Sequence, residues 1–418
     1  MAVRPAFFLA GLLAVNVVPA QTAAPAATAA EAAKPADPQQ LAIGDPARAQ
    51  RKAPVVLDAV TDTATGELIT DAEMARRLAD ARVLFIGEQH TDASFHEVEL
   101  RAIQALHAAG RKVIIGLEMF PWTQPPALAA WSRGKLTEQQ FLDQADWYGT
   151  WSHHWGYYRE IFQFARDKRL PLIGINAPRD VVKTVRSKGL DGLDPASRAR
   201  MPPSIDITNA EHRQLFRAYF DSDDALHSKM PPEQLESLYQ AQVTWDSAMG
   251  WNAGQALPKR DDPRAIVVVL IGSGHVAYGL GAERQLKAHF KGRIASLIPV
   301  MVKDKDRKPV ATVSASYANF IWGVPFSAGP TLPVLGVSLM GKLGKEPSKV
   351  IQVSEDSVAA HAGIKVGDIL RSLDGVAIDS SATLQKQTGN YRWGDVAQLS
   401  IERDGATQTL PLPFRRQD

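Results

Sequence analysis

The chain has 418 residues, more than one ordinary core accommodates, and its length therefore predicts two or three domains. Hydrophobic residues make up 45% of it and the formal net charge is +2, which excludes the strongly basic surface expected of a protein that binds nucleic acid or an acidic membrane. Cysteine is absent, which excludes disulfides and a lipid anchor on an export signal.

The chain begins with a pattern that is typical of a secretory signal peptide, predicted over residues 1–20. Arg4 precedes an apolar run, and Ala20 closes a small-residue cleavage motif. A membrane span needs about 20 apolar residues, and this run is shorter, so an uncleaved anchor is the less favoured alternative. Residues 21–53 are rich in Ala and Pro and predict a disordered linker. We therefore expect a periplasmic protein without a lipid anchor.

Residues 54–325 alternate short apolar runs with amphipathic helical patterns. Continuous apolar runs of this length are typical of strands buried on both faces. Their alternation with helices predicts an α/β domain with a mostly parallel sheet flanked by helices. The predicted strands cover residues 83–86, 113–117, 172–175 and 266–271, with two closing strands at 294–302 and 318–322.

After Pro325 the pattern changes to short β-type runs separated by Gly and Asp-Gly turns. Residues 330–416 are enough for one small, β-rich domain. Its strands are predicted at residues 334–339, 350–353, 368–373 and 396–401, with helices at 358–362 and 380–386.

Polar side chains follow the predicted strands of the α/β domain. Glu88 and His90 follow the first strand, Glu118 the second, and His275 the most apolar one. The carboxyl ends of parallel strands meet at one edge of a sheet, where ligands bind, so we expect these side chains to lie close together. Asp246 is expected to join them, because its charge stands in an otherwise apolar helix face.

This set of side chains suits two chemistries. Glu88, His90, Glu118 and His275 can bind a divalent metal, or they can form a catalytic set in which a carboxylate orients a histidine as general base. Alternatively, a carboxylate after a strand is a helix cap or a solvated turn residue. Capping explains one such residue more readily than several strand ends, so we favour a functional site.

Aromatic residues crowd the segment 147–162, with His153 and His154 among them. Trp147, Trp151 and Trp155 recur at helical spacing, which predicts a stripe that faces the core. The alternative is a flat apolar ligand site in which a His or Tyr reaches an iron.

Five motifs in the α/β domain carry a family resemblance. They are FIGEQH at 85–90, GLEMF at 116–120, AQ at 241–242 with Asp246, IGSGHVAYGLG at 271–281 and YANFIW at 317–322. In this order they resemble the motifs of ChaN-like haem-binding uptake proteins, which are related to the Tiki and TraB group. The resemblance covers residues 55–325. The positions of Glu88, His90, Glu118 and His275 correspond to the shared motif residues of that wider group.

The resemblance implies an α/β fold and the binding of haem, or of an iron-related ligand, for uptake. Haem-binding members are lipid-anchored dimers that use a tyrosine as iron ligand, so Tyr278, which lies in a matched motif, is the candidate haem ligand, and a homodimer is the implied assembly. Related members look like metal-dependent proteases. A metal-dependent hydrolase or peptidase therefore remains an alternative function, and a non-catalytic periplasmic adaptor is another.

The C-terminal domain carries a second resemblance. LGV at 335–337 and SVAAHAGIKVGDIL at 357–370 are similar to the PDZ domains of exported bacterial proteases. Such a domain binds an extended peptide as an added strand. The resemblance implies that the backbone amides of Leu335, Gly336 and Val337 receive the peptide's terminal carboxylate and so recruit a peptide or protein partner. The alternative is a PDZ fold that serves only for docking within the chain.

Overall fold

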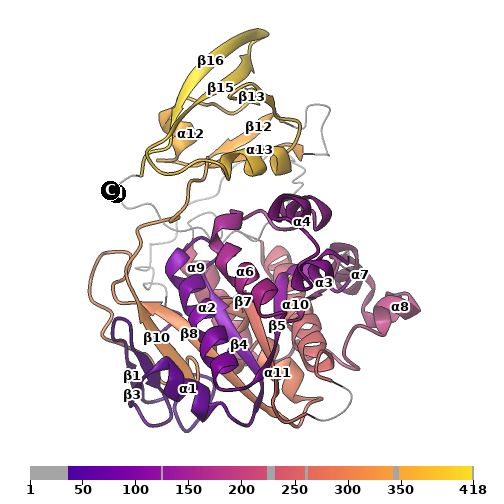
Figure 1. Cartoon of the computed structure of the whole chain (residues 1–418), viewed down its shortest axis with the longest axis vertical. Helices are drawn as coiled ribbons and strands as arrows, with labels where there is room; N and C mark the ends of the chain where they lie inside the picture. The colour runs from indigo at the N-terminus through magenta and orange to yellow at the C-terminus, as the bar shows by residue number, and fades with distance from the viewer. Residues whose placement is uncertain (1–35, 124–125, 224–230, 259–261, 342–347, 417–418) are drawn as a thin grey trace, which may run out of the picture.

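The computed structural model describes residues 36–123, 126–223, 231–258, 262–341 and 348–416. Figure 1 shows a larger α/β domain and, at one end of it, a small β-rich C-terminal domain, each with a hydrophobic core of its own. The predicted signal peptide and the start of the predicted linker lie outside the described residues. Among the described helices, none combines the length and the apolar character needed to cross a membrane.

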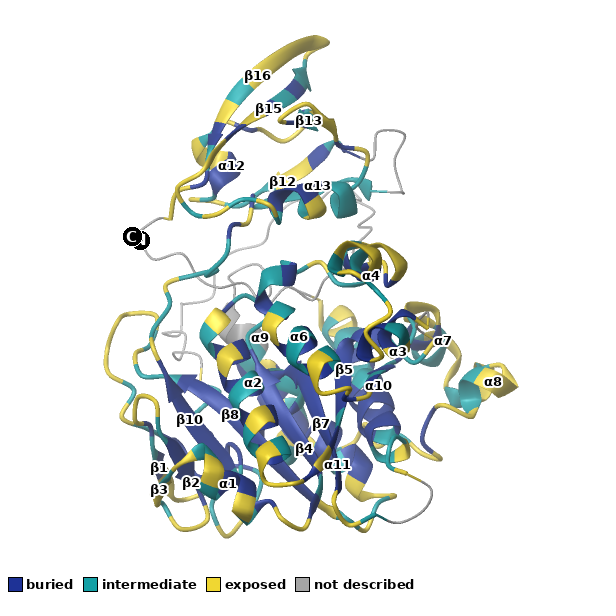
Figure 2. Ribbon diagram, viewed as in Figure 1, coloured by how far each residue is buried: buried dark blue, intermediate teal, exposed yellow. Residues whose placement is uncertain are grey.

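One eight-stranded sheet forms the centre of the α/β domain. Its central strands are buried along almost their whole length, as the dark blue ribbons of Figure 2 show. Only β2 runs antiparallel to its two neighbours, so the predicted mostly parallel sheet is confirmed. Across the sheet the order is β3 (Leu68–Ile69), β2 (Val60–Asp62), β10 (Phe320–Val324), β8 (Arg293–Met301), β4 (Ala81–Glu88), β7 (Ala265–Gly272), β5 (Lys112–Pro121) and β6 (Leu172–Asn176).

Helices cover both faces of the sheet, because successive side chains of a strand point to opposite sides. Leu84 and Ile86 pack in the core on one face, and Val83 and Phe85 pack in the core on the other. The first face is covered by α1 (Asp71–Arg77), α2 (Ala93–Ala108), α3 (Ala127–Ser132), α4 (Glu138–Gln144), α5 (Trp147–Thr150) and α6 (Arg159–Asp167). The second is covered by α9 (Ala210–Asp223), α10 (Pro232–Gln255) and α11 (Ala282–Lys287), with α7 (Arg179–Lys188) packed on α10; α8 (Pro195–Arg198) is peripheral.

The expected disordered linker is wrong for residues 36–53, which pack against the α/β domain. Leu41 and Ile43 are buried in the core of the second face. Strand β1 (Lys52–Pro54) pairs antiparallel with β9 (Thr312–Ser314). Two apolar side chains in an Ala- and Pro-rich segment form no periodic pattern, and for this reason the composition did not reveal the packing.

The aromatic segment is three short elements rather than one helix. Trp147 in α5 and Trp155 in the 3-10 turn η1 (Trp155–Tyr157) are buried in the first core, as the core-facing stripe predicts. Trp151 between them adopts an extended backbone conformation, which ends α5 and leaves its side chain only partly buried. Trp151 nevertheless packs against the edge of the same core.

The C-terminal domain combines a two-stranded and a four-stranded antiparallel sheet. Strands β14 and β16 of the four-stranded sheet were not predicted, because their side chains are mostly exposed and form no apolar pattern. The elements are β11 (Val337–Leu339), β12 (Val350–Val353), α12 (Val358–His361), β13 (Ile369–Leu373), β14 (Val376–Ala377), α13 (Ser381–Thr388), β15 (Val396–Arg403) and β16 (Ala406–Pro413).

Thr331 joins the two domains beside the first turn of α2. Its backbone N–H donates to the carbonyl of Thr91 at 2.9 Å, and its hydroxyl accepts from the N–H of Ala93 at 2.8 Å. The indole N–H of Trp393, in the C-terminal domain, donates to the carbonyl of Thr331 at 3.0 Å. One residue is therefore bonded to both domains.

Asp368 is a buried carboxylate that should stabilise the C-terminal domain. It accepts two hydrogen bonds from Arg403, each of 2.7 Å, and one from the N–H of Lys365. Burial opposes the charge, but the Arg403 hydrogen bonds hold the pKa of Asp368 below its usual 3.8. A lowered carboxyl pKa adds stability above the unfolded value, and this stability is lost as the pH falls through the folded value.

We expect Asp368→Asn to destabilise the C-terminal domain by about 2 kcal/mol, the usual worth of hydrogen bonds to a charged group. Hydrogen exchange of β13 and β15 in the full chain should become faster at neutral pH. Glu355→Gln, in the exposed turn after β12, is the matched control and should leave exchange unchanged. Equal exchange in both variants would show that the Arg403 pair does not stabilise the domain.

Candidate functional site

The strand-end site consists of Glu88, His90, Glu118 and His275, which the folded sheet brings together. Strand β7 lies between β4 and β5, so the carboxyl ends of the three strands are neighbours. His90 Nδ1 lies 2.6 Å from Glu88 Oε1, and His275 Nε2 lies 3.4 Å from Glu118 Oε1. One ligand atom each from Glu88, His90 and Glu118 lies within 4.8 Å of the others. This spacing is compatible with a single bound metal ion.

Gly272, the last residue of β7, permits this close arrangement. Its N–H donates to Glu118 Oε2 at 2.6 Å. A methyl group at this position would lie 3.3 Å from Cε1 and 3.5 Å from Nε2 of His90. The absent side chain therefore lets the His90 imidazole lie directly against the strand end.

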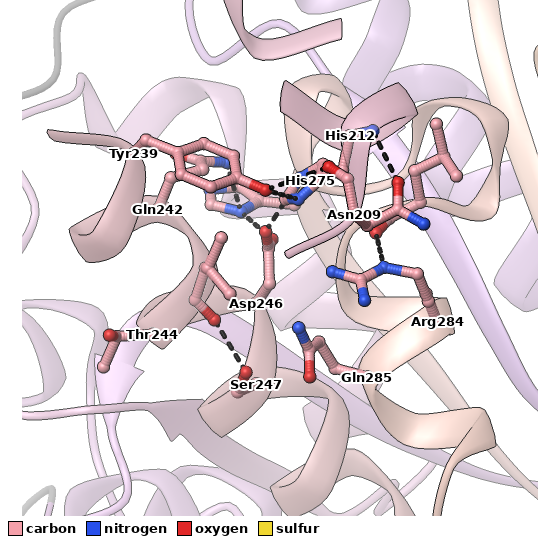
Figure 3. Close-up of polar contacts among 12 residues, drawn as sticks. Asn209, His212, Tyr239, Gln242, Thr244, Asp246, Ser247, His275, Arg284 and Gln285 are labelled. Carbon is pink, nitrogen blue, oxygen red and sulfur yellow. Dashed lines mark hydrogen bonds and ion pairs between the residues drawn. The ribbon is translucent and has the colours of Figure 1, made fainter. Parts of the chain in front are cut away.

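Asp246 supports His275 from α10, as Figure 3 shows. Asp246 Oδ1 lies 2.6 Å from His275 Nδ1, and the Gln242 side-chain amide lies 2.9 Å from the same nitrogen. On the other side, His212 Nε2 is 3.3 Å from Asp246 Oδ2. His212 comes from α9 and was not singled out in the sequence, because a lone His in a helical pattern carries no spacing signal.

The charges around His275 determine its protonation. Burial alone would lower the pKa of His275, but Asp246 and Glu118 raise it to about 10. Burial raises the pKa of each carboxyl, yet the neighbouring His275 brings both below their usual range. At neutral pH His275 is therefore an imidazolium between two carboxylates, and a metal that binds it must displace a proton.

Behind Glu88 lies a second polar group, which the sequence analysis missed. His96 Nδ1 is 3.1 Å from Glu88 Oε2 and 2.9 Å from Glu99 Oε2. The Tyr158 hydroxyl donates to Glu88 Oε1 at 2.8 Å. The available signal was the pairing of His96 and Glu99, three residues apart, on the apolar face of α2.

Aromatic rings lie beside the partly exposed His90. The ring centroids of Trp151 and His153 are each 4.8 Å from that of His90. Burial, with a smaller effect of His90, lowers the pKa of His153 to about 3. His153 is therefore neutral and retains a lone pair on its ring, which suits it to bind a metal.

Tyr278, the candidate haem ligand, lies away from this cluster. It is buried, its hydroxyl donates to the carbonyl of Pro38 at 2.9 Å, and the N–H of Leu41 donates to it at 2.9 Å. The N-terminal segment thus holds the hydroxyl, and an iron ligand role would require these bonds to break. That role stays a prediction.

The predicted peptide-binding residues immediately precede or begin an edge strand of the C-terminal domain. The carbonyls of Leu335 and Gly336 accept hydrogen bonds from Ala359 and Ser354 within the domain. Gly336 has a φ of +80°, and a Cβ there would lie 2.3 Å from the Cβ of Ser357, so the turn requires glycine. Among the described strands, β11 pairs with β12 alone, which leaves its other edge for an added strand.

The fold and the cluster define an α/β protein with a polar site at the carboxyl edge of its sheet, joined to a small β-rich module. Residues 74–286 match the family model described as haem-binding uptake, Tiki superfamily, ChaN, and residues 333–413 match the PDZ domain model. The chain belongs to the ChaN family of haem-binding uptake proteins and carries a PDZ domain.

Known proteins are similar over parts of the chain. The periplasmic serine endoprotease DegP of Escherichia coli K12 is 38% identical over 92 residues, which is 20% of this chain and 19% of that protein. A probable DegP-like periplasmic serine endoprotease of Pseudomonas fulva is 46% identical over 63 residues, 15% of this chain and 13% of that protein. The chain thus spans less than a fifth of these relatives. The structure of cofacial heme binding to ChaN of Campylobacter jejuni is 17% identical, with a TM-score of 0.49, over 63% of this chain and 95% of that one.

Asp246→Asn tests the charge that acts on His275. It preserves the shape of the side chain and removes its charge, so we expect the pKa of His275 to fall from about 10 by roughly one to three units. Imidazole NMR signals of the full chain would give the titration. Asp262→Asn, far from His275 in the loop before β7, serves as control. A His275 titration that is identical in wild type and Asp246→Asn would contradict the assignment.

Proposed function

We propose that this is an exported protein whose α/β domain binds haem, or a related iron-containing ligand, for uptake, while its PDZ domain recruits a peptide or protein partner. The observation that carries the proposal is the orientation of His90. The buried carboxylate of Glu88 lies 2.6 Å from His90 Nδ1. A carboxylate at one ring nitrogen fixes the imidazole and directs the other nitrogen to a metal. The haem-binding family supports the choice of ligand.

The side chains around His90 fit an iron-containing ligand. Imidazole is a common ligand of haem iron, and haem, when bound, would supply an iron that accepts such a ligand. His90 would hold it and Glu88 would keep the imidazole in place. The rings of Trp151 and His153 beside His90 offer flat contact surfaces of the kind found in ligand sites.

Export is supported by the periplasmic relatives of the chain. The signal peptide predicted over residues 1–20 agrees with a periplasmic location. The homodimer implied by the family resemblance also stays a prediction.

A metal-dependent hydrolase is the second candidate, and one specific arrangement favours it. Glu88, His90 and Glu118 are close enough to hold one divalent ion. Beside them, Asp246 keeps His275 protonated and directed at Glu118. In such an enzyme the metal would activate water, and His275 is placed to give a proton to a leaving group.

Hemin titration of the purified full chain tests the haem proposal. We expect a saturable shift of the Soret band with micromolar or tighter affinity, the usual range of specific ligand sites. His90→Ala removes the proposed iron ligand and should weaken binding at least about tenfold, equivalent to one ligand interaction of about 1.4 kcal/mol.

His289→Ala is the matched control, because His289 is exposed in the turn that follows α11. It should bind hemin as the wild type does. Without any saturable shift in the wild type, or with equal affinities in wild type and His90→Ala, the haem assignment to this site fails. Peptide cleavage that depends on added metal and is lost in Glu118→Gln would then favour the hydrolase.

The PDZ domain offers a test that needs no variant. We expect the full chain to bind peptides with a free C-terminal carboxylate, since the backbone amides near Gly336 would receive it. The same peptide with an amidated C-terminus should bind at least about tenfold more weakly, because charge-assisted hydrogen bonds are lost. Fluorescence anisotropy measures both affinities. Equal binding of the two forms would favour a domain used only for docking within the chain.

A further inference from the structure

We propose that the α/β domain contains a second cation site, the inner cluster, formed by Glu88, His96 and Glu99 and suited to a divalent transition metal. The inner cluster lies behind the strand-end site and shares Glu88 with it. The proposal deepens the proposed function and rests on it only through the role of Glu88 in orienting His90.

The three ligand groups converge because of where the fold places them. Glu88 is the last residue of β4, and His96 and Glu99 are three residues apart on the buried face of α2. Their side chains are no more than 2% exposed. One ligand atom from each lies within 4.8 Å of the other two. Such a set differs from an ordinary acidic cluster, which is exposed and solvated.

Two carboxylate oxygens in the inner cluster accept no hydrogen bond of good geometry. Glu88 Oε2 and Glu99 Oε1 are buried and accept no well-directed hydrogen bond from any described residue. An unpaired buried carboxylate oxygen is costly, and buried charges are normally paired or bind a metal. A cation bound between them would satisfy both oxygens, and this observation is independent of the spacing of the ligand atoms.

His96 directs one ring nitrogen at both carboxylates. Its Nε2 lies 3.4 Å from the carbonyl of His90, so a proton on this nitrogen is directed at an acceptor. Its Nδ1 faces Glu88 Oε2 at 3.1 Å and Glu99 Oε2 at 2.9 Å. Three ligand atoms thus converge on one point, where a metal ion would take the place of the proton on Nδ1.

The distances fit a metal of ordinary size. Metal–ligand bonds of about 2.1 Å at right angles separate neighbouring ligand atoms by about 3.0 Å. The separations of 2.9 and 3.1 Å around His96 Nδ1 have this length. One imidazole with two carboxylates suits Mn²⁺, Fe²⁺ or Zn²⁺ better than Ca²⁺, which prefers oxygen ligands.

Glu88 connects the two sites through its two oxygens. Oε1 contacts His90 Nδ1 at 2.6 Å and accepts from the Tyr158 hydroxyl at 2.8 Å, whereas Oε2 faces His96. One carboxylate thus orients the histidine of the strand-end site and is a ligand of the inner cluster. A metal held there would fix Glu88, and through it the His90 imidazole.

Metal content of the full chain tests the proposal. The protein would be produced with Zn²⁺ or Mn²⁺ in the medium, dialysed against the same ion and then against metal-free buffer, and analysed by mass spectrometry for metal per chain. We expect wild type to retain an equivalent of metal that Glu99→Gln loses. Glu97→Gln, an exposed position on the same helix, should keep it. His90→Ala, which leaves the inner cluster intact, should also retain one equivalent.

The proposal is overturned if wild type and Glu99→Gln hold the same amount of metal, because a proton then compensates the two carboxylates. If Glu99→Gln does not fold, His90→Ala decides: one retained equivalent supports the inner cluster, and none overturns it. None of these counts requires hemin, so failure of the haem proposal leaves this result readable. Loss of the metal in Glu99→Gln with an unchanged Soret shift would support the inner cluster as a metal site. The same result would show that this metal is not needed for hemin binding.

Discussion

The buried carboxylate of Glu88 is the constraint on which the polar interior of the α/β domain depends. A charge at the end of a central strand requires partners, and the chain supplies them from three places: His90 after β4, His96 in α2 and Tyr158 in the aromatic segment. Burial would raise the pKa of Glu88, but His96 and His90 hold it well below its usual range. Helix α2 and the aromatic segment therefore both contact one carboxylate. A change in the packing of either would move a partner of Glu88 and so alter the strand-end site.

The sequence predicts the α/β sheet well, because each central strand is a continuous apolar run that only a doubly covered sheet can bury. It predicts edge elements poorly. β16 is mostly exposed, and the segment around Leu41 and Ile43 packs with two side chains in an otherwise uninformative composition. A segment that buries only a few side chains packs against the domain without showing a periodic apolar pattern in its sequence.

The strand-end residues could be located because chain order places Glu88, Glu118 and His275 after parallel strands, whose ends are neighbours in space. His96 and Glu99 were not located, because they lie beside Phe95 and Val98 on the buried face of α2, which the sequence pattern identifies only as an apolar helix face. Only the fold shows that this face of α2 meets a strand-end carboxylate. The sequence therefore indicates which groups lie at an edge, but not which groups support them from behind.

The hydrogen bonds of Thr331 have a mechanical consequence. The residue is held by the C-terminal domain through Trp393 and by the start of α2 through Thr91 and Ala93. Thr91 directly follows His90 in the chain. A rotation of the C-terminal domain about Thr331 would therefore act first on the backbone next to His90. A force from a bound partner would reach the loop that carries His90 before it reached the strands of the sheet.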